Sequence, residues 1–165
     1  MGRDSGQPHP NLARVVAAAA AAGLRIEVQR FPEGTRTAAD AARAVGCNVA
    51  QIVKSLVFVA DGEPVIALVS GADRLDPARL AAALGATVVR RADGDEARAA
   101  TGFAIGGVPP IGHVRSMTIL MDERLLVHDL VWAAAGLPDA VFKAAPRELQ
   151  AAARARMADL RGDRA

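Results

Sequence analysis

Two apolar segments joined by a short polar turn constrain the fold of this chain more than any other feature. Ile52–Ala60 and Pro64–Ser70 are nearly continuous in Val, Ile and Leu, and the Asp61-Gly62-Glu63 turn between them indicates a β-hairpin. Strands of this kind are buried on both faces. The hairpin is therefore expected to lie centrally in a sheet whose two faces are covered.

Helical and strand patterns alternate along the rest of the chain. Apolar spacing and capping residues predict helices over 11–22, 37–46, 76–85, 93–101 and 146–160. Alternation and short apolar runs predict further strands over 24–31, 87–90, 117–121, 130–134 and 140–143, with a turn over 31–36. Strands follow one another too often for a doubly wound parallel sheet, so the predicted class is α+β, a mixed α/β domain.

The size of the chain and its charge narrow the possibilities. With 165 residues and 52% apolar content, one well-buried core is the default. We expect a frayed segment over residues 1–10 and one domain over residues 11–160. The net charge is only +2, so the protein is not expected to coat nucleic acid, and any contact with nucleic acid should be local.

The single cysteine is typical of a protein in a reducing compartment, and the arrangement of the histidines predicts that no metal is bound. The single Cys47 excludes an intrachain disulfide, and the three histidines are too scattered for a zinc site. The longest apolar runs are too short to span a bilayer, and the first ten residues lack the features of a signal peptide. We therefore expect a cytoplasmic protein with no membrane association and no cofactor.

Lys54 places a charge on an apolar face of the first hairpin strand. Period-two alternation puts it on the same face as Ile52, Leu56 and Phe58. Burying an ammonium is costly unless an anion offsets it, so Lys54 is paired, extends into water at the strand's mouth, or is functional. The chain has 18 arginines but only two lysines, which indicates a need for a compact ammonium at this position.

A second unusual segment, 102–113, reads Gly-Phe-Ala-Ile-Gly-Gly-Val-Pro-Pro-Ile-Gly-His. Its glycines allow the backbone to approach a ligand closely, and its two prolines fix φ and remove amide donors. The pattern is typical of a preformed ligand loop, with a surface turn as the alternative. If it is a ligand loop, Gly106, Gly107 and Pro110 should line the same cleft as Lys54.

Other site chemistries fail on spacing. Lys54-Ser55 resembles the end of a P-loop, but no glycine precedes the lysine and the pair lies inside a strand. There is no Gly-x-Ser-x-Gly elbow, and His128-Asp129 has no nucleophile beside it in sequence. Cys47 has no paired base near it and is expected to be a small core residue rather than a nucleophile.

One set of motifs extends over nearly the whole chain, from about Leu12 to Leu149. It comprises Gln51-Ile52-Val53-Lys54-Ser55-Leu56, the hairpin, the helix over 75–85, and Thr101-Gly102-Phe103 leading into Gly106-Gly107-Val108-Pro109-Pro110-Ile111-Gly112. Together these motifs resemble the YbaK/prolyl-tRNA synthetase-associated domain family. The resemblance implies a single compact domain with a mixed, barrel-like β-sheet flanked by helices.

The resemblance also implies a function. It implies a free-standing trans-editing enzyme that deacylates mischarged aminoacyl-tRNA, usually tRNA for proline. Its partners would be the aminoacyl-tRNA acceptor end and, as a candidate, prolyl-tRNA synthetase. Lys54 matches the family's essential lysine and is the expected catalytic residue. The residues expected to bind the substrate are Phe31, Thr37, Ser55, Gly106, Gly107, Val108, Pro109, Pro110, Gly112 and His113.

The specificity is less constrained than the activity. Alanine-editing relatives tend to carry Asn after the lysine and His inside the loop motif, where this chain has Ser55 and Gly107. The difference argues against an alanine editor and leaves Cys-tRNA or another small residue open. His113 either reaches the mouth of the site or is an exposed loop residue. A non-catalytic tRNA-binding or synthetase-associated module and a small-molecule binding protein remain alternative functions.

Overall fold

The computed structural model describes residues 9–31 and 37–162; the expected turn through Pro32 and Gly34 and most of the expected frayed segment fall outside these residues. The described helices are α1 (Pro10–Ala21), α2 (Ala38–Val45), α3 (Pro77–Leu84), α4 (Gly94–Thr101) and α5 (Pro146–Ala153), with 3-10 turns η1 (Val49–Gln51) and η2 (Glu123–Val127). The described strands are β1 (Gln29–Arg30), β2 (Ile52–Ala60), β3 (Glu63–Ser70), β4 (Val89–Arg91), β5 (Thr118–Asp122), β6 (Val131–Ala134), β7 (Ala140–Ala144) and β8 (Arg156–Ala158).

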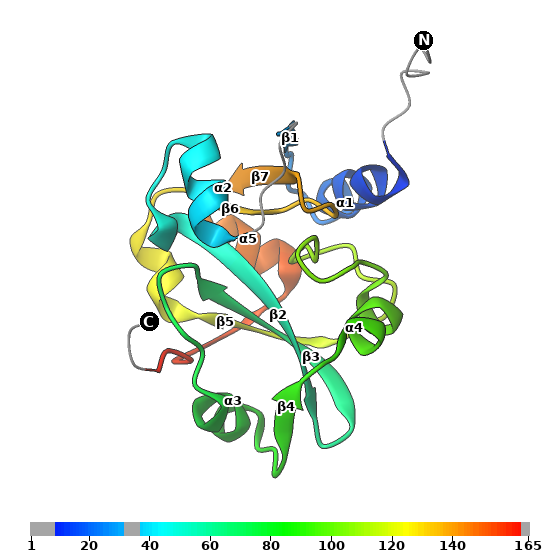
Figure 1. Cartoon of the computed structure of the whole chain (residues 1–165), viewed down its shortest axis with the longest axis vertical. Helices are drawn as coiled ribbons and strands as arrows, with labels where there is room; N and C mark the ends of the chain where they lie inside the picture. The colour runs from blue at the N-terminus through cyan, green and yellow to red at the C-terminus, as the bar shows by residue number, and fades with distance from the viewer. Residues whose placement is uncertain (1–8, 32–36, 163–165) are drawn as a thin grey trace.

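The eight strands form one mixed sheet flanked by helices, which confirms the predicted fold class (Figure 1). Along the sheet the order is β1-β7-β6-β2-β3-β5-β8, and β4 adds to β2 on the same edge as β6. The β2–β3 hairpin is central and antiparallel along its length. Its turn residues Asp61 and Gly62 have φ values of 47° and 84°, the left-handed conformation that suits the twist of a two-residue hairpin.

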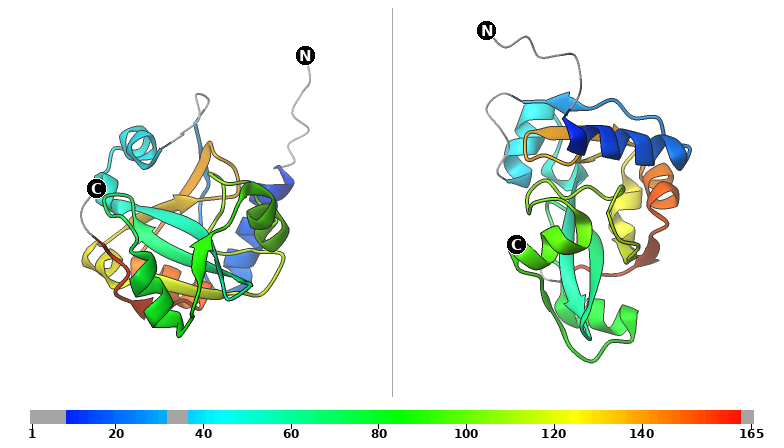
Figure 2. Two further views of the ribbon diagram at one scale, coloured as in Figure 1. Left: turned by 60° about the horizontal axis from the view of Figure 1, so that its bottom comes forward. Right: turned by 90° about the vertical axis from the view of Figure 1, so that its right-hand side faces the viewer.

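The two faces of the hairpin are covered by different elements, as expected from its continuous apolar sequence. One core cluster contains Val53 and Val57 of β2 together with residues of α1 and α5. The other contains Phe58 of β2 and Leu80 of α3, with Leu56 packed against it. Figure 2 shows α1 and α3 at separate ends of the molecule. Successive β2 residues therefore face different parts of the core.

The predicted helix boundaries are confirmed where a capping residue sets them. Thr37 and Asp40 form a capping box at the start of α2, and Gly46 ends that helix with φ 77°. Asp76 caps α3, and Gly85 ends it in the left-handed conformation. None of the helices in the described ranges is both long and apolar enough to cross a membrane.

Two predicted elements are corrected. The strand expected over 24–31 is reduced to β1, because only Gln29 and Arg30 pair with a neighbour, β7. Leu24 is nevertheless buried, so the alternating pattern reflects packing rather than pairing. The helix expected over 146–160 ends at Ala153, because Arg154 adopts φ 53° and the chain turns into β8, which pairs parallel with β5.

This reversal places Leu160, which is fully buried, in the cluster under α3. We expect Leu160→Ala to lower the free energy of unfolding by about 2–5 kcal/mol, the usual cost of such a truncation in a packed core. Urea unfolding followed by circular dichroism measures this change. The matched control is Val127→Ala. Val127 is 78% exposed, so this substitution should change the free energy of unfolding by no more than about 0.5 kcal/mol. Equal effects of the two substitutions would contradict the assigned role of the C-terminal segment.

Candidate functional site

A cavity of about 330 Å3 lies along an incompletely paired edge of β2. On this edge β6 pairs with Ile52 and Val53, and β4 pairs with Phe58 to Ala60. Between these two neighbours, no strand among the described residues pairs with this edge of β2 at residues 54–57, although β3 pairs with them along the other edge. All four of these consecutive residues line the cavity, together with parts of α2, β4, β6, β7 and the loop after α4. The cavity therefore opens onto both faces of the strand.

The hairpin register directs main-chain groups of β2 into this gap. Ala60 and Glu63 flank the turn as a pair, so the even-numbered residues of β2 bond to β3. Odd-numbered residues then direct their amide and carbonyl groups to the other side, as the Val57 carbonyl does when it accepts from the Ala92 amide at 3.0 Å. By the same register, the Ser55 amide and carbonyl point into the gap between β6 and β4.

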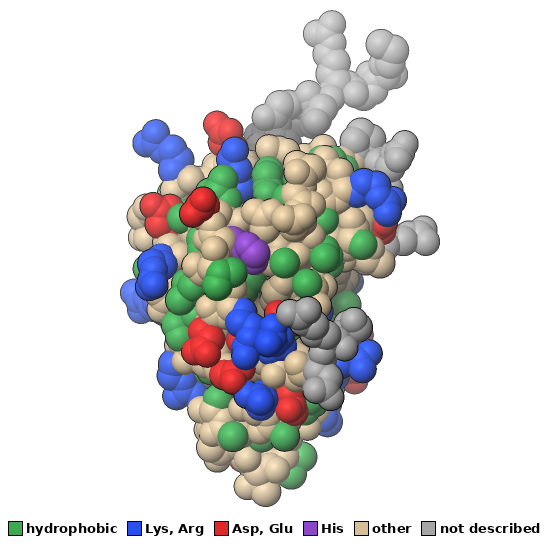
Figure 3. Space-filling model, turned by 90° about the vertical axis from the view of Figure 1, so that its left-hand side faces the viewer, with side chains coloured by type: hydrophobic (Ala, Val, Ile, Leu, Met, Phe, Trp, Pro, Cys, Tyr) green, Lys and Arg blue, Asp and Glu red, His purple; other side chains and the backbone are tan. Residues whose placement is uncertain are grey.

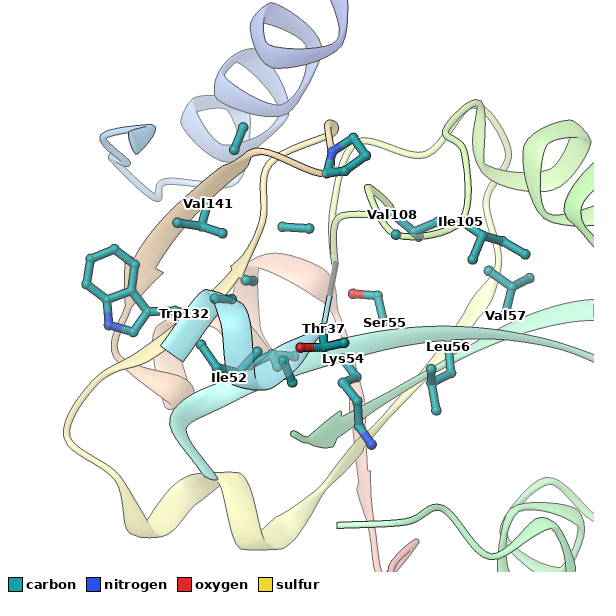
Figure 4. Close-up of a pocket in the computed structure, with 18 of the residues that line it drawn as sticks. Thr37, Ile52, Lys54, Ser55, Leu56, Val57, Ile105, Val108, Trp132 and Val141 are labelled. Atoms are coloured by element: carbon teal, nitrogen blue, oxygen red, sulfur yellow. The ribbon is translucent and has the colours of Figure 1, made fainter. Parts of the chain in front are cut away.

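The Ser55 hydroxyl adds a side-chain group at the same place. Its Oγ is buried and has no hydrogen-bond partner among the described residues. Figure 4 shows Ser55 and Val57 on one side of β2, facing Val108 and Ile105 of the loop. Buried hydroxyls are usually hydrogen-bonded, so this orphaned group in a cavity wall is available to a polar atom of a ligand.

Lys54 leaves β2 on the opposite side from Ser55 (Figure 4). Its Nζ donates a hydrogen bond of 2.6 Å to the carbonyl of Asp73, in the turn after β3. Burial lowers the pKa of Lys54; the Asp73 carboxylate opposes this shift, and Arg91 and Arg74 reinforce it. Two of the three ammonium hydrogens remain for water or for a ligand anion.

The loop after α4 contributes Ile105, Gly106 and Val108 to the cavity, but not the other glycines and prolines. Gly107 instead faces the turn between β6 and β7, where a Cβ would lie 3.0 Å from Leu137 Cα. Pro109 and Pro110 are buried. Gly112, with φ 86°, packs against α1.

His113 forms a hydrogen bond to this loop and lies outside the cavity lining. It is partly buried, and its Nε2 donates to the carbonyl of Pro109 at 2.6 Å. Burial lowers the pKa of His113, and the hydrogen bond to Pro109 opposes the shift. His113 therefore lies neither in the cavity lining nor in an exposed loop position, the two alternatives that the sequence left open.

The structure thus brings together part of the predicted site. Around the cavity lie Lys54, Ser55, Thr37, Gly106 and Val108. The predicted residues outside its lining are Phe31, Gly107, Pro109, Pro110, Gly112 and His113. The expected convergence on Lys54 therefore applies to Gly106, but not to Gly107 or Pro110.

The sequence reading missed the far wall of the cavity. This wall is formed by Trp132 of β6, Pro138 in the turn after β6 and Val141 of β7. Arg91 of β4, which lines the cavity at the other end of the gap, was also missed. Trp132 and Val141 lie in the strands expected over 130–134 and 140–143, but a strand pattern does not reveal which strands become neighbours. Arg91 and Pro138 lie outside the expected strands. In the described part of the chain, no group of three or more His, Cys, Asp or Glu residues is arranged to hold a metal ion.

Cys47 is a partly buried residue outside the cavity lining. Cys47 packs against the small cluster formed by Ala41, Ala42 and Ile52, and burial raises the pKa of its thiol, which disfavours the reactive thiolate.

On the face shown in Figure 3, acidic and basic side chains are interspersed. The net charge of +2 is therefore not gathered into one basic surface on that face.

Both the sequence and the fold of this chain are similar to those of known proteins. Residues 32–152 match the model of the aminoacyl-tRNA editing domain. A crystal structure described as a proposed trans-editing enzyme for prolyl tRNA synthetase is 45% identical, with a TM-score of 0.89, over 95% of this chain and 100% of that one. The family resemblance inferred from the sequence motifs is confirmed.

Similar curated proteins are much longer than this chain. The proline–tRNA ligase of Acidithiobacillus ferrooxidans is 40% identical over 103 residues, which cover 62% of this chain and 18% of that enzyme. The proline–tRNA ligase of Streptococcus equi subsp. equi is 37% identical over 86 residues, which cover 52% of this chain and 14% of that enzyme. The chain thus matches less than a fifth of each of these relatives.

The contact of Gly107 with the β6–β7 turn gives a test of the loop's position. We expect Gly107→Ala to lower the free energy of unfolding by about 1–3 kcal/mol, because its Cβ meets main-chain atoms of Leu137 that cannot rotate away. Gly94→Ala is the control, since a Cβ at Gly94 has no atom within 4 Å. Thermal and urea melts compare the two variants, and equal stabilities would place the loop away from Leu137.

Proposed function

Because this chain belongs to the family of aminoacyl-tRNA editing domains, we propose that its cavity binds the aminoacylated 3′ end of a tRNA and that the ester is hydrolysed there. The observation that carries the proposal is the open edge of β2, where Lys54 and the orphaned Ser55 hydroxyl border one cavity. The alternatives are a non-catalytic tRNA-binding or synthetase-associated module and a small-molecule binding protein.

The reaction needs little from the protein besides positioning and charge. Water adds to the carbonyl carbon of the ester and the bond to the ribose oxygen breaks, which yields a free amino acid and a tRNA with a free 3′ hydroxyl. The ester is already activated, so no protein nucleophile is required. Negative charge develops on the carbonyl oxygen, where a fixed amide and a nearby ammonium stabilise it.

The two sides of β2 suggest a division of roles. The Ser55 side carries the orphaned hydroxyl and the apolar wall formed by Ile105 and Val108, which suit an uncharged aminoacyl group, and the Ser55 amide points into the gap at the strand edge. The Lys54 side carries the positive charge, which suits the phosphate or ester end of the acceptor. Lys54 is accordingly the residue to which we assign the largest effect on catalysis.

The proposed substrate is tRNA for proline carrying cysteine or another small amino acid. Two observations support it: the similarity to proline–tRNA ligases, and the predominantly apolar lining of the cavity, which disfavours a charged side chain. A prolyl-tRNA synthetase is the corresponding candidate partner. Incubation of the purified protein with a panel of aminoacyl-tRNAs, including mischarged tRNA for proline, tests the activity. Binding without turnover would instead support a non-catalytic module, and no dependence on tRNA would support a small-molecule binder.

Lys54→Ala should reduce single-turnover deacylation by at least about a hundredfold, the usual loss when a transition-state donor is removed. Stability should stay within about 1 kcal/mol of the wild type, because the substitution also removes a partly buried charge. Lys54→Arg should not restore the rate, since a planar guanidinium does not fit a site shaped around an ammonium. The control is Lys143→Ala, the other lysine of the chain, which is an exposed residue of β7 with its ammonium over the Trp132 ring. A near-native rate for Lys54→Ala would remove this residue from the mechanism, and a near-native rate for Lys54→Arg would contradict the need for a compact ammonium.

Ser55→Ala should slow deacylation by up to about tenfold without loss of stability, because the hydroxyl has no partner among the described residues and one neutral hydrogen bond is worth roughly 0.5–1.5 kcal/mol. The contrasting variant is Ser70→Ala. The Ser70 hydroxyl donates to the Ala50 carbonyl at 2.8 Å and accepts from the Ala72 amide, so its loss should lower the melting temperature. Rate and melting measurements on both variants separate the two roles. A destabilised Ser55→Ala with a normal rate would assign this hydroxyl to the fold.

A further inference from the structure

Lys54 is accompanied by two arginines near its side of β2. Arg91 of β4 pairs directly with Phe58, and directly paired residues project from the same face of a sheet. Phe58 and Lys54 are both even-numbered residues of β2, so Arg91 shares their face. Arg74 directly follows Asp73, whose carbonyl accepts the hydrogen bond from Lys54. Both arginines are exposed, and Arg91 borders the cavity.

Neither arginine has a carboxylate partner among the described residues. The ion pairs found there use other arginines, namely Arg30, Arg79, Arg90, Arg115, Arg124 and Arg161. Arg91 instead stacks over the Phe58 ring, 5.5 Å from its centroid. Asp73 is the nearby acid; it is buried and has Arg161 at 3.9 Å. Among the charges that shift the pKa of Lys54, Asp73 is the one acid and stands against Arg91 and Arg74, and Asp73 also has Arg161 as an ion-pair neighbour.

This grouping has an energetic cost in the free protein. The charges of Arg91 and Arg74 both disfavour the protonated form of Lys54, which burial already disfavours. Like charges held together at the mouth of a cavity, with few acids to compensate, are stabilised when an anion binds between them. Arg90 shows the contrasting arrangement on the same strand. Its side chain projects from the opposite face and forms two hydrogen bonds of 2.7 and 2.8 Å with Glu96.

We propose that Arg91 and Arg74, next to Lys54, form a phosphodiester-binding strip, which holds the last backbone phosphates of the single-stranded 3′ end of tRNA and leaves Lys54 to act on the ester. The acyl-bearing ribose would then cross the open edge of β2, so that the aminoacyl group lies on the Ser55 side. This inference rests on the proposed function for the identity of the ligand. The strip itself rests on the shared face of Lys54 and Arg91 and on the absence of ion-pair partners within the described residues.

The test measures binding of uncharged tRNA for proline by fluorescence anisotropy over a range of salt concentrations. Arg91→Gln and Arg74→Gln should each weaken binding by about five- to tenfold at low salt. Each should also reduce the slope of log K against log salt by about 0.7, the value for one phosphate contact on a single strand. Arg90→Gln is the matched control and should keep both the affinity and the slope. Arg91→Lys retains the charge and should keep the slope.

A deacylation assay gives a second readout. The loss in Arg91→Gln should fall mainly on KM, whereas the loss in Lys54→Ala should fall on kcat. If the wild type binds and deacylates tRNA but the two glutamine variants keep its affinity and salt slope, the strip is wrong and the proposed function stands. If the wild type binds no tRNA at all, both are wrong. Thermal melts of each variant confirm that the comparison is between folded proteins.

Discussion

The site depends on how far the neighbours of β2 extend along its outer edge. β6 pairs only as far as Val53, and β4 begins to pair at Phe58. Continuous pairing would satisfy the main-chain groups of Ser55 and close the cavity. An interrupted edge instead presents an amide, a carbonyl and a hydroxyl within a rigid central strand, and β3 holds that strand along its other edge. The recognition surface is thus part of the sheet, and its geometry is as fixed as the sheet itself.

The position of Lys54 depends on contacts made by the end of the chain. Its hydrogen-bond acceptor lies in the turn between β3 and α3, and the C-terminal segment holds that turn through the bonds from the Asp76 amide to Leu160 and from the Gly162 amide to Arg74. The same segment is fixed to β5 by Asp122, a fully buried carboxylate that accepts from the Leu160 amide. Gly71 in the turn has no room for a side chain, because a Cβ would lie 2.7 Å from the Val49 carbonyl. Residues remote in sequence therefore orient the lysine.

The sequence predicted those elements whose signals are local. The capping box at Thr37, the Asp61-Gly62 turn and the Asp76-Pro77 helix start each depend on a few adjacent residues, and all three are confirmed. The alternation of side chains along a strand was sufficient to predict which face of β2 carries Lys54. Pairing between distant segments left no such signal: the parallel β2–β6 contact and β8 come from tertiary packing, so the far wall of the cavity and the end of α5 were missed. The glycines of the loop were ambiguous as well. A glycine in the sequence indicates a close approach of the backbone to another group, but it does not reveal whether that group is a ligand or, as for Gly107, the main chain of Leu137.

A single strand separates two environments that would otherwise conflict. A polyanion needs exposed cations, whereas an uncharged acyl group needs apolar walls and fixed dipoles that exclude water. Alternation along β2 provides both at adjacent residues, with Lys54 on one side and Ser55 on the other (Figure 4). The ester that joins the two parts of the proposed substrate would then lie at the strand edge itself, next to the inward-pointing amide of Ser55. An edge that a third strand does not cover is the place in a sheet where one ligand can contact both faces, which is why the short reach of β4 and β6 matters more for this site than any one side chain.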